Sequence, residues 1–224
     1  MVETGRIIQG NCLEIMKDWT DGCADVTITD PPYSDKTHKG ARTGDRGENK
    51  LIHFDSVDSQ YIINLAKRLC VISKRWVVMT CDWIHCAEIA KACPDIFIRA
   101  GVWTKPNPMP QMSGDRPAMG WEAVAILHRP GVKKWNGGGH AAVWNFNKIS
   151  GEHPTQKPMD LIIKWMHWFS NEGETILDPY CGSGTTLLAA EKMNRKWIGI
   201  ELDPKYVQVA QSRIDAEKAQ GRLF

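Results

Sequence analysis

The chain has 224 residues, of which 42% are hydrophobic and 24% are charged, the composition of an ordinary soluble globular protein. Its formal net charge of +2 is too small to identify a nucleic-acid-binding protein, so any basic surface must come from local clustering. No apolar run reaches transmembrane length and residues 1–5 lack the layout of a signal peptide, so we expect a cytoplasmic protein with no membrane partner.

The spacing of cysteine and histidine indicates reduced thiols rather than cross-links or a metal site. Seven cysteines, an odd number without framework spacing, argue against a disulfide scaffold. Cys81, His85, Cys86 and Cys93 lie close together, but they include no C-x-x-C pair and fall in a segment typical of a helix that follows a strand. A structural role explains them better than zinc, and we expect no metal ligands.

Apolar periodicity predicts strands that alternate with helices. The expected strands are residues 6–9, 24–28, 75–80, 96–104, 121–128, 175–177 and 196–200. The expected helices are residues 11–19, about 58–72, 83–92, 159–170, 185–194 and a last one from about 204. This alternation implies a single α/β domain over residues 1–224, with a mostly parallel sheet covered on both faces.

A rigid polar loop is expected at the end of the second strand, at Asp30-Pro31-Pro32-Tyr33. The two prolines remove backbone donors and fix φ, so the strand cannot continue. The loop then presents a carboxylate, prolyl carbonyls and an aromatic ring, a set that suits a flat molecule bearing an amino group. Taken alone, the tetrapeptide is equally well explained as a strand-ending turn.

A second loop with the character of a binding site follows the strand at 175–177. Gly182 and Gly184 allow a close approach to a ligand, and Ser183 and Thr185 stand where a helix begins and backbone N–H groups point outward. Glu201 ends the next strand, where an acidic residue can accept both hydroxyls of a ribose. The dinucleotide fingerprint G-x-G-x-x-G and the P-loop pattern are both absent.

Four motifs in one order resemble the β-group amino DNA methyltransferases. They are Asp-Pro-Pro-Tyr (30–33), His-Pro-Thr-Gln-Lys-Pro (153–158), Asp-Pro-Tyr-Cys-Gly-Ser-Gly-Thr-Thr (178–186) and Ile-Gly-Ile-Glu (198–201). In that family the catalytic tetrapeptide precedes the cofactor loop, and the resemblance spans about residues 6–215. It implies a doubly wound, mostly parallel seven-stranded sheet with S-adenosylmethionine across the carboxyl ends of the strands.

The resemblance also implies which residues hold this cofactor. Asp178, Cys181, Gly182 and Gly184 match the positions that bind its methionine end, and Glu201 matches the ribose ligand. The other matching positions are Asn11 and Cys12 beside the adenine ring, Thr155 and Lys157 over the methionine carboxylate, and Asp30, Pro179, Tyr180, Ser183 and Thr185 around the loop. Tyr180 and Cys181 depart mildly from the Phe and the Met or Cys usual there.

For catalysis the resemblance implies residues Asp30, Pro31, Pro32 and Tyr33. Tyr33 would stack on a base flipped out of the duplex, while Asp30 and the carbonyl of Pro31 accept its two amino hydrogens. An Asp at the head of the tetrapeptide favours N6 of adenine over N4 of cytosine. The alternatives are cytosine, methylation of RNA or a protein amide, and a non-catalytic DNA-binding regulator.

DNA recognition is expected from segments that fit no α/β unit, at about 34–50 and within 104–150 (104–118 and 130–150). Each of their polar residues alone is better explained as a solvated loop residue, but together they are the candidates for DNA contact: Lys36, Lys39, Arg42, Arg46, Lys105, Asn107, Gln111, Arg116, Lys133, Lys134 and Trp135. So short a recognition region favours a short DNA site, relaxed specificity or a homodimer, and a cognate restriction endonuclease is a candidate partner.

Overall fold

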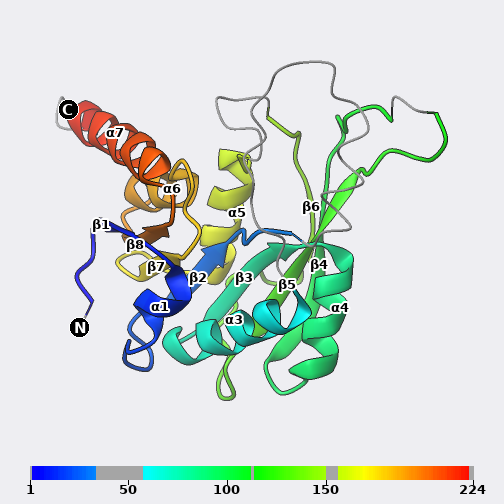
Figure 1. Cartoon of the computed structure of the whole chain (residues 1–224), viewed down its shortest axis with the longest axis horizontal. Coiled ribbons are helices and arrows are strands. Elements are labelled where there is room, and N and C mark those ends of the chain that lie inside the picture. Colours follow the sequence, from blue (N-terminus) through cyan, green and yellow to red (C-terminus); the bar gives the residue numbers. More distant parts are fainter. Residues whose placement is uncertain (1, 34–57, 112–113, 150–155, 222–224) are drawn as a thin grey trace.

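The computed structural model describes residues 2–33, 58–111, 114–149 and 156–221. Within them lies one eight-stranded sheet with the order β1-β8-β7-β2-β3-β5-β4-β6, and among these strands β5 alone runs antiparallel to its neighbours (Figure 1). The strands are β1 (Arg6–Gln9), β2 (Val26–Thr29), β3 (Trp76–Cys81), β4 (Phe97–Thr104), β5 (Trp121–His128), β6 (Val143–Asn145), β7 (Thr175–Asp178) and β8 (Lys196–Glu201).

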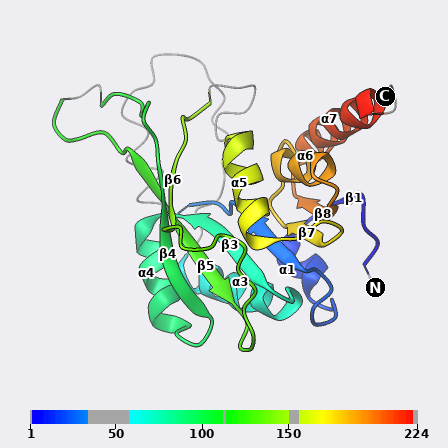
Figure 2. The same ribbon diagram turned by 180° about the vertical axis from the view of Figure 1, so that it is seen from behind.

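Helices cover both faces of this sheet, as expected for a doubly wound fold. They are α1 (Cys12–Met16), α3 (Ser59–Ile72), α4 (Trp83–Ala92), α5 (Met159–Phe169), α6 (Thr185–Lys192) and α7 (Pro204–Gly221). One buried cluster joins α1, α3 and α4 to the sheet, and a second joins α5, α6 and α7 to its other face, seen from behind in Figure 2. In the described part of the chain, no helix is long and apolar enough to cross a membrane.

Local sequence explains where these elements lie. Every residue of β2, β3 and β7 is buried, as expected for central strands packed on both faces. Asp58 caps α3 by accepting from the backbone N–H of Tyr61 at 2.7 Å, and Asp82 caps α4 by accepting from that of His85 at 2.8 Å. The helix starts predicted from the sequence are therefore confirmed by cap geometry.

The number of strands differs from the prediction, because β6 lies within residues 130–150, which were expected to be irregular. A strand of three residues is too short to show period-two alternation. Its stability comes from pairing with β4, where Gly101 leaves room for the Trp144 ring; a Cβ on Gly101 would meet that ring at 2.6 Å. Helix α1 is also shorter than predicted, ending at Met16 rather than near residue 19.

The topology places a crevice between β7 and β2. The chain continues from β2 to β3 on one side and from β7 to β8 on the other, so the strand order reverses there. In open α/β sheets, ligands bind at the carboxyl ends of the strands at such a switch point.

Candidate active site

A cavity of about 540 Å³ opens at the carboxyl ends of β1, β2, β7 and β8. Its volume lies within the range of small-molecule sites, roughly 300–1,000 Å³. Residues 30–33, residues 178–183 and Glu201 all line it, so the structure brings the three expected loops together around one space.

The carboxylate of Asp30 lies in this cavity, one residue after β2, and both of its oxygens are engaged. Oδ1 accepts a short hydrogen bond from the hydroxyl of Thr80 on β3. Oδ2 pairs with the ammonium of Lys157 at 2.5 Å. These contacts tie the segment before α5 to the loop at residues 30–33.

Glu122 of β5 is a second buried carboxylate in the same cavity. Its Oε2 accepts from the Tyr33 hydroxyl at 2.6 Å and lies 3.3 Å from Lys157 Nζ, while its Oε1 accepts from Lys105 Nζ at 2.5 Å. Burial raises the pKa of Glu122, but the ammonium groups of Lys157 and Lys105 outweigh it and hold that pKa at about 2. Glu122 is therefore ionised at neutral pH.

The same neighbours act on the titration of Lys157 and Tyr33. Burial lowers the pKa of Lys157, but Asp30 and Glu122 outweigh it and raise the pKa above its ordinary value. Burial, with the negative charges of Asp30 and Glu122, raises the pKa of Tyr33 well above its usual value. The Lys157 ammonium also faces two rings, 5.6 Å from the centre of Tyr33 and 5.8 Å from that of Trp103.

The loop after β7 is organised around the buried carboxylate of Asp178. Its Oδ1 accepts from the Thr29 hydroxyl at 2.8 Å and from the backbone N–H of Tyr180 at 3.1 Å. Burial raises the pKa of Asp178 to about 6, and these hydrogen bonds oppose the shift. Gly184 has φ +81, and a Cβ there would meet the Ala210 Cβ at 2.8 Å, so the loop requires glycine where α6 begins.

Glu201, at the end of β8, faces the other side of the cavity. Its Oε2 accepts from the backbone N–H of Gly182 at 2.9 Å, and its Oε1 accepts from that of Asp203 at 2.9 Å. A carboxylate has about four lone-pair sites, so each oxygen keeps capacity for a further donor such as a ribose hydroxyl. These acceptor oxygens therefore fit the ribose hydroxyls of S-adenosylmethionine.

Asn11 and Cys12 also line the cavity, at the start of α1. The Asn11 side chain accepts from the backbone N–H of Leu13 at 2.9 Å, which caps that helix. Beyond Cys12, the hydroxyls of Tyr61 and Tyr180 lie 2.5 Å apart and form a polar link between α3 and the loop after β7.

The expected cofactor residues gather at this cavity, with two exceptions. Thr155 lies outside the described residues, and Gly184 shapes the start of α6 rather than lining the space. The positions that do line it are Asn11, Cys12, Asp30, Lys157, Asp178, Pro179, Tyr180, Cys181, Gly182, Ser183, Thr185 and Glu201.

Among the described residues, those expected to contact DNA lie in separate places. Lys36, Lys39, Arg42 and Arg46 lie outside the described residues. Lys105 lines the cavity, where its side chain is 13% exposed and paired with Glu122. The side chain of Asn107 is bonded to the backbone of Lys148, and exposed Arg116 lies 3.1 Å from Asp115.

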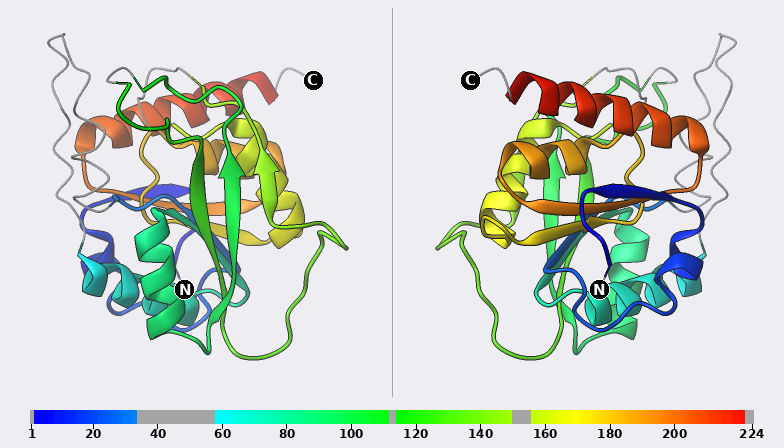
Figure 3. Two further views of the ribbon diagram at one scale, coloured as in Figure 1. Left: turned by 90° about the vertical axis from the view of Figure 1, so that its right-hand side faces the viewer. Right: turned by 90° about the vertical axis from the view of Figure 1, so that its left-hand side faces the viewer.

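Lys133, Lys134 and Trp135 stand at the opposite edge of the sheet. The carbonyl of Lys134 accepts from Trp76 Nε1 at 2.6 Å. Trp76 is the first residue of β3, whereas Thr80, which contacts Asp30, lies near the end of that strand. At about 3.3 Å per residue, that separation is roughly 13 Å along the strand. Figure 3 shows residues 130–140 as the loop at the lower end of the sheet, away from the loop that joins β4 to β5.

Several cavity residues belong to none of the sequence motifs, among them Tyr61, Trp103, Glu122 and Tyr206, and neither does Thr80, which is buried behind the cavity and donates to Asp30. The sequence could have indicated Glu122 as a site residue, since it is the one charged residue in the apolar run at 121–127. A lone acidic residue in a buried strand requires a partner, and here the partners are Lys105, Lys157 and Tyr33.

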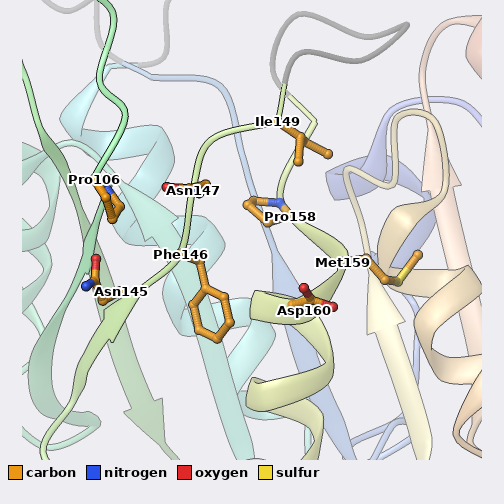
Figure 4. Close-up of a pocket in the computed structure, with 8 residues that line it drawn as sticks. All are labelled: Pro106, Asn145, Phe146, Asn147, Ile149, Pro158, Met159 and Asp160. Carbon is orange, nitrogen blue, oxygen red and sulfur yellow. The ribbon is translucent and has the colours of Figure 1, made fainter.

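A second cavity of about 470 Å³ lies beside the first (Figure 4). Phe146, after β6, stands on one side of it, and Met159 and Asp160, at the start of α5, stand on the other. Pro106 and Pro158 line this space, and the residues before them, Lys105 and Lys157, line the first. The two cavities therefore share a wall.

Cys81, Cys86 and Cys93 pack in the apolar core, and His85 lies 3.6 Å from Asp82. Over residues 2–33, 58–111, 114–149 and 156–221, no group of three His, Cys, Asp or Glu side chains is placed to hold a metal ion.

Known proteins are similar to this chain in sequence and in fold. The chain is 36% identical over 132 residues to the Type II methyltransferase M.XycI of Xanthomonas campestris pv. cyanopsidis, covering 53% of this chain and 44% of that protein. It is 26% identical to the Type II methyltransferase M2.MboI of Moraxella bovis, covering 93% and 86% of the two chains. The chain thus spans less than half the length of M.XycI and most of M2.MboI.

A solved structure gives the same picture. The M1.HpyAVI–SAM complex superposes with a TM-score of 0.69 and 26% identity, covering 94% of this chain and 98% of that one. Residues 24–212 match the N6/N4 DNA methylase family, whose members use S-adenosylmethionine. This match covers most of the chain and both motif loops of the cavity, and the chain therefore belongs to the N6/N4 family of DNA methylases.

Proposed function

We propose that this chain transfers a methyl group from S-adenosylmethionine to N6 of an adenine within a specific DNA sequence. The observation that carries the proposal is the shared cavity, into which the carboxylates of Asp30 and Glu201 both open from different strands. The carboxylate of Asp30 suits the amino group of a base, and that of Glu201 suits the hydroxyls of a ribose. The site for the methyl acceptor would therefore lie beside the site for the methyl donor.

The cofactor would lie against the loop after β7 and the end of β8. Glu201 would accept the ribose hydroxyls, and residues 178–184 would hold the methionine end. Asn11 and Cys12 would flank the adenine ring. When bound, S-adenosylmethionine supplies an electrophilic methyl group on its sulfonium.

The target base would enter beside Asp30 after leaving the duplex, because its amino nitrogen cannot reach the cofactor while stacked. Tyr33 would stack against its face. The Asp30 carboxylate and the Pro31 carbonyl would accept hydrogen bonds from its two amino hydrogens and so raise electron density on the nitrogen. That nitrogen would take the methyl group as the bond from carbon to sulfur breaks and a neutral thioether leaves, and the Asp30 carboxylate would pass the released proton to solvent. Positioning and charge stabilisation supply most of the acceleration in such a reaction.

Adenine is the proposed base because Asp30 heads the tetrapeptide, the residue more usual for N6 of adenine in the family that this chain resembles. Cytosine is the second candidate, since it also carries an amino group beside a ring nitrogen and suits the same acceptors. We further infer a restriction-modification context, because M.XycI and M2.MboI are both named Type II methyltransferases.

The test is transfer of labelled methyl from S-adenosylmethionine to unmodified plasmid DNA, followed by digestion to nucleosides and separation by mass. We expect N6-methyladenine. N4-methylcytosine would retain the mechanism and replace the base. If the label never enters DNA although the protein binds the cofactor, the target is RNA or a protein amide, or the chain is a regulator.

A further inference from the structure

Glu122 occupies a position in the cavity that the known motifs do not explain. It pairs in register with Trp103 of β4, and its side chain is 15% exposed. Lys105 holds Oε1 at 2.5 Å, which leaves Oε2 facing the Tyr33 hydroxyl at 2.6 Å and the Lys157 ammonium at 3.3 Å. The carboxylate therefore contacts two residues of the catalytic neighbourhood through one oxygen.

Each oxygen of Asp30 has one partner in this structure. Thr80 donates to Oδ1 and Lys157 pairs with Oδ2 at 2.5 Å. A carboxylate that must accept amino hydrogens from a base needs an oxygen that is not neutralised by an ammonium group. The ion pair with Lys157 is thus a state of the site in which the ammonium neutralises the charge of Asp30.

Lys157 has another acceptor within reach. Among the described residues, the carboxylates within 4.0 Å of its Nζ are those of Asp30 and Glu122. The side chain of Lys157 is 11% exposed, so an ammonium that left Asp30 without a partner would be buried and unpaired, which is strongly unfavourable. Glu122 is a partner within the protein that lowers this penalty, beside the methionine carboxylate that the resemblance places at Lys157, because the ammonium exchanges one carboxylate for another 3.3 Å away.

Resting on the proposed function, we propose that Glu122 is a positioning residue for methyl transfer. It takes the Lys157 ammonium when the target amine reaches Asp30, and its bond to the Tyr33 hydroxyl holds that ring in place for the base. Lys105 keeps Glu122 oriented for both tasks.

The experiment measures single-turnover methyl transfer to DNA at saturating S-adenosylmethionine for the wild type, Glu122→Gln, Lys157→Met and the double variant. We expect Glu122→Gln to slow transfer at least tenfold in the wild-type background and less than twofold in the Lys157→Met background. Without Lys157 there is no ammonium to move, so Glu122 loses that role. An equal loss in both backgrounds, or a rate for Glu122→Gln within twofold of wild type, would overturn the proposal.

Two further variants separate this role from charge balance and folding. Glu174→Gln is the matched control, because Glu174 forms a similarly buried ion pair with Arg75 at 2.6 Å, away from the cavity; we expect wild-type transfer. Glu122→Gln combined with Lys105→Met keeps the cluster balanced, and we expect it to stay slow; recovery of the rate would overturn the proposal. If the wild type itself transfers no methyl group to DNA, the proposed function fails, and this inference fails with it.

Discussion

The ammonium of Lys157 lies 2.5 Å from Oδ2 of Asp30, although the two residues are 127 positions apart in the chain. Lys157 immediately precedes the turn into α5, and Asp30 directly follows the last residue of β2. This pair joins the segment before α5 to the loop at residues 30–33, so a change at either residue affects both segments.

Asp30→Ala should reduce methyl transfer at least about 100-fold, the scale of losing one charge-stabilising group in an active site. Lys157 keeps Glu122 as a partner, so folding should survive. Single-turnover transfer and thermal unfolding, measured on the same sample, check both halves of this expectation. Normal transfer by a folded variant would remove Asp30 from the mechanism.

Substitutions of Tyr33 should separate its ring from its hydroxyl. Tyr33→Ala removes the stacking surface, and we expect a loss of about 1–3 kcal/mol in kcat/KM for DNA. Tyr33→Phe keeps the ring and loses only the hydrogen bond to Glu122, so its loss should be smaller. Equal kcat/KM for Tyr33→Ala and wild type would argue against a flipped base in this cavity.

Glu201→Gln should weaken cofactor binding. Both carboxylate oxygens accept a backbone N–H, from Gly182 and Asp203, and an amide can replace only one of them as an acceptor. Loss of a hydrogen bond to a charged group costs about 1.5–3 kcal/mol, so we expect the Kd for S-adenosylmethionine to rise by roughly 10- to 150-fold. Calorimetry measures this; an unchanged Kd would show that Glu201 is not a ribose ligand.

The titration of Asp178 predicts a pH-dependent stability effect. Burial raises its pKa from the ordinary 3.8 to about 6, so between these values the folded chain holds a proton that the unfolded chain has released. The contribution of Asp178 to the free energy of unfolding is therefore fully present below about pH 4 and is lost as the pH rises through 6. A shift of that size corresponds to about 3 kcal/mol.

Asp178→Asn should remove that loss, because its amide oxygen can accept the same bonds from Thr29 and Tyr180 without a buried charge. We expect the variant to be more stable than wild type at pH 7.5, by up to about 3 kcal/mol, with the difference vanishing near pH 4. Urea denaturation at the two pH values measures it. A variant that is less stable at pH 7.5 would show that the ionised form is the favoured one.

The site loops could be predicted from sequence because each is contiguous. A strand followed by Asp30-Pro31-Pro32-Tyr33, or by the glycines after Asp178, carries its chemistry within a few residues, and parallel strands bring such loops to one edge. The layered α/β fold followed from the same alternation of strands and helices.

What could not be predicted depends on contacts between distant strands. Glu122 reaches Tyr33, 89 positions away, because β5 inserts next to β3 in the sheet. The sequence also does not indicate that β5 is antiparallel. Since this strand is antiparallel, the chain leaves it at the end where β3 begins, which carries Lys133 and Lys134 away from the cavity.

The antiparallel direction of β5 also affects which basic residues can contact DNA. Lys148 lines the mouth of the cavity, and Asn107 holds its backbone through two hydrogen bonds at 2.7 and 2.9 Å. Lys148→Glu should therefore weaken DNA binding several-fold and reduce the salt dependence of the affinity by about one unit of slope, as expected for one phosphate contact. Fluorescence anisotropy at several salt concentrations measures both quantities.

The matched control is the double variant Lys133→Glu and Lys134→Glu, which changes twice the charge at the opposite edge of the sheet. If DNA lies over the carboxyl ends of the strands, this variant should bind within about twofold of wild type, because charges more than a Debye length of about 8–10 Å away are largely screened. A larger loss from the double variant than from Lys148→Glu would place the DNA against the loop at 130–140, and would restore the grouping that the sequence suggested.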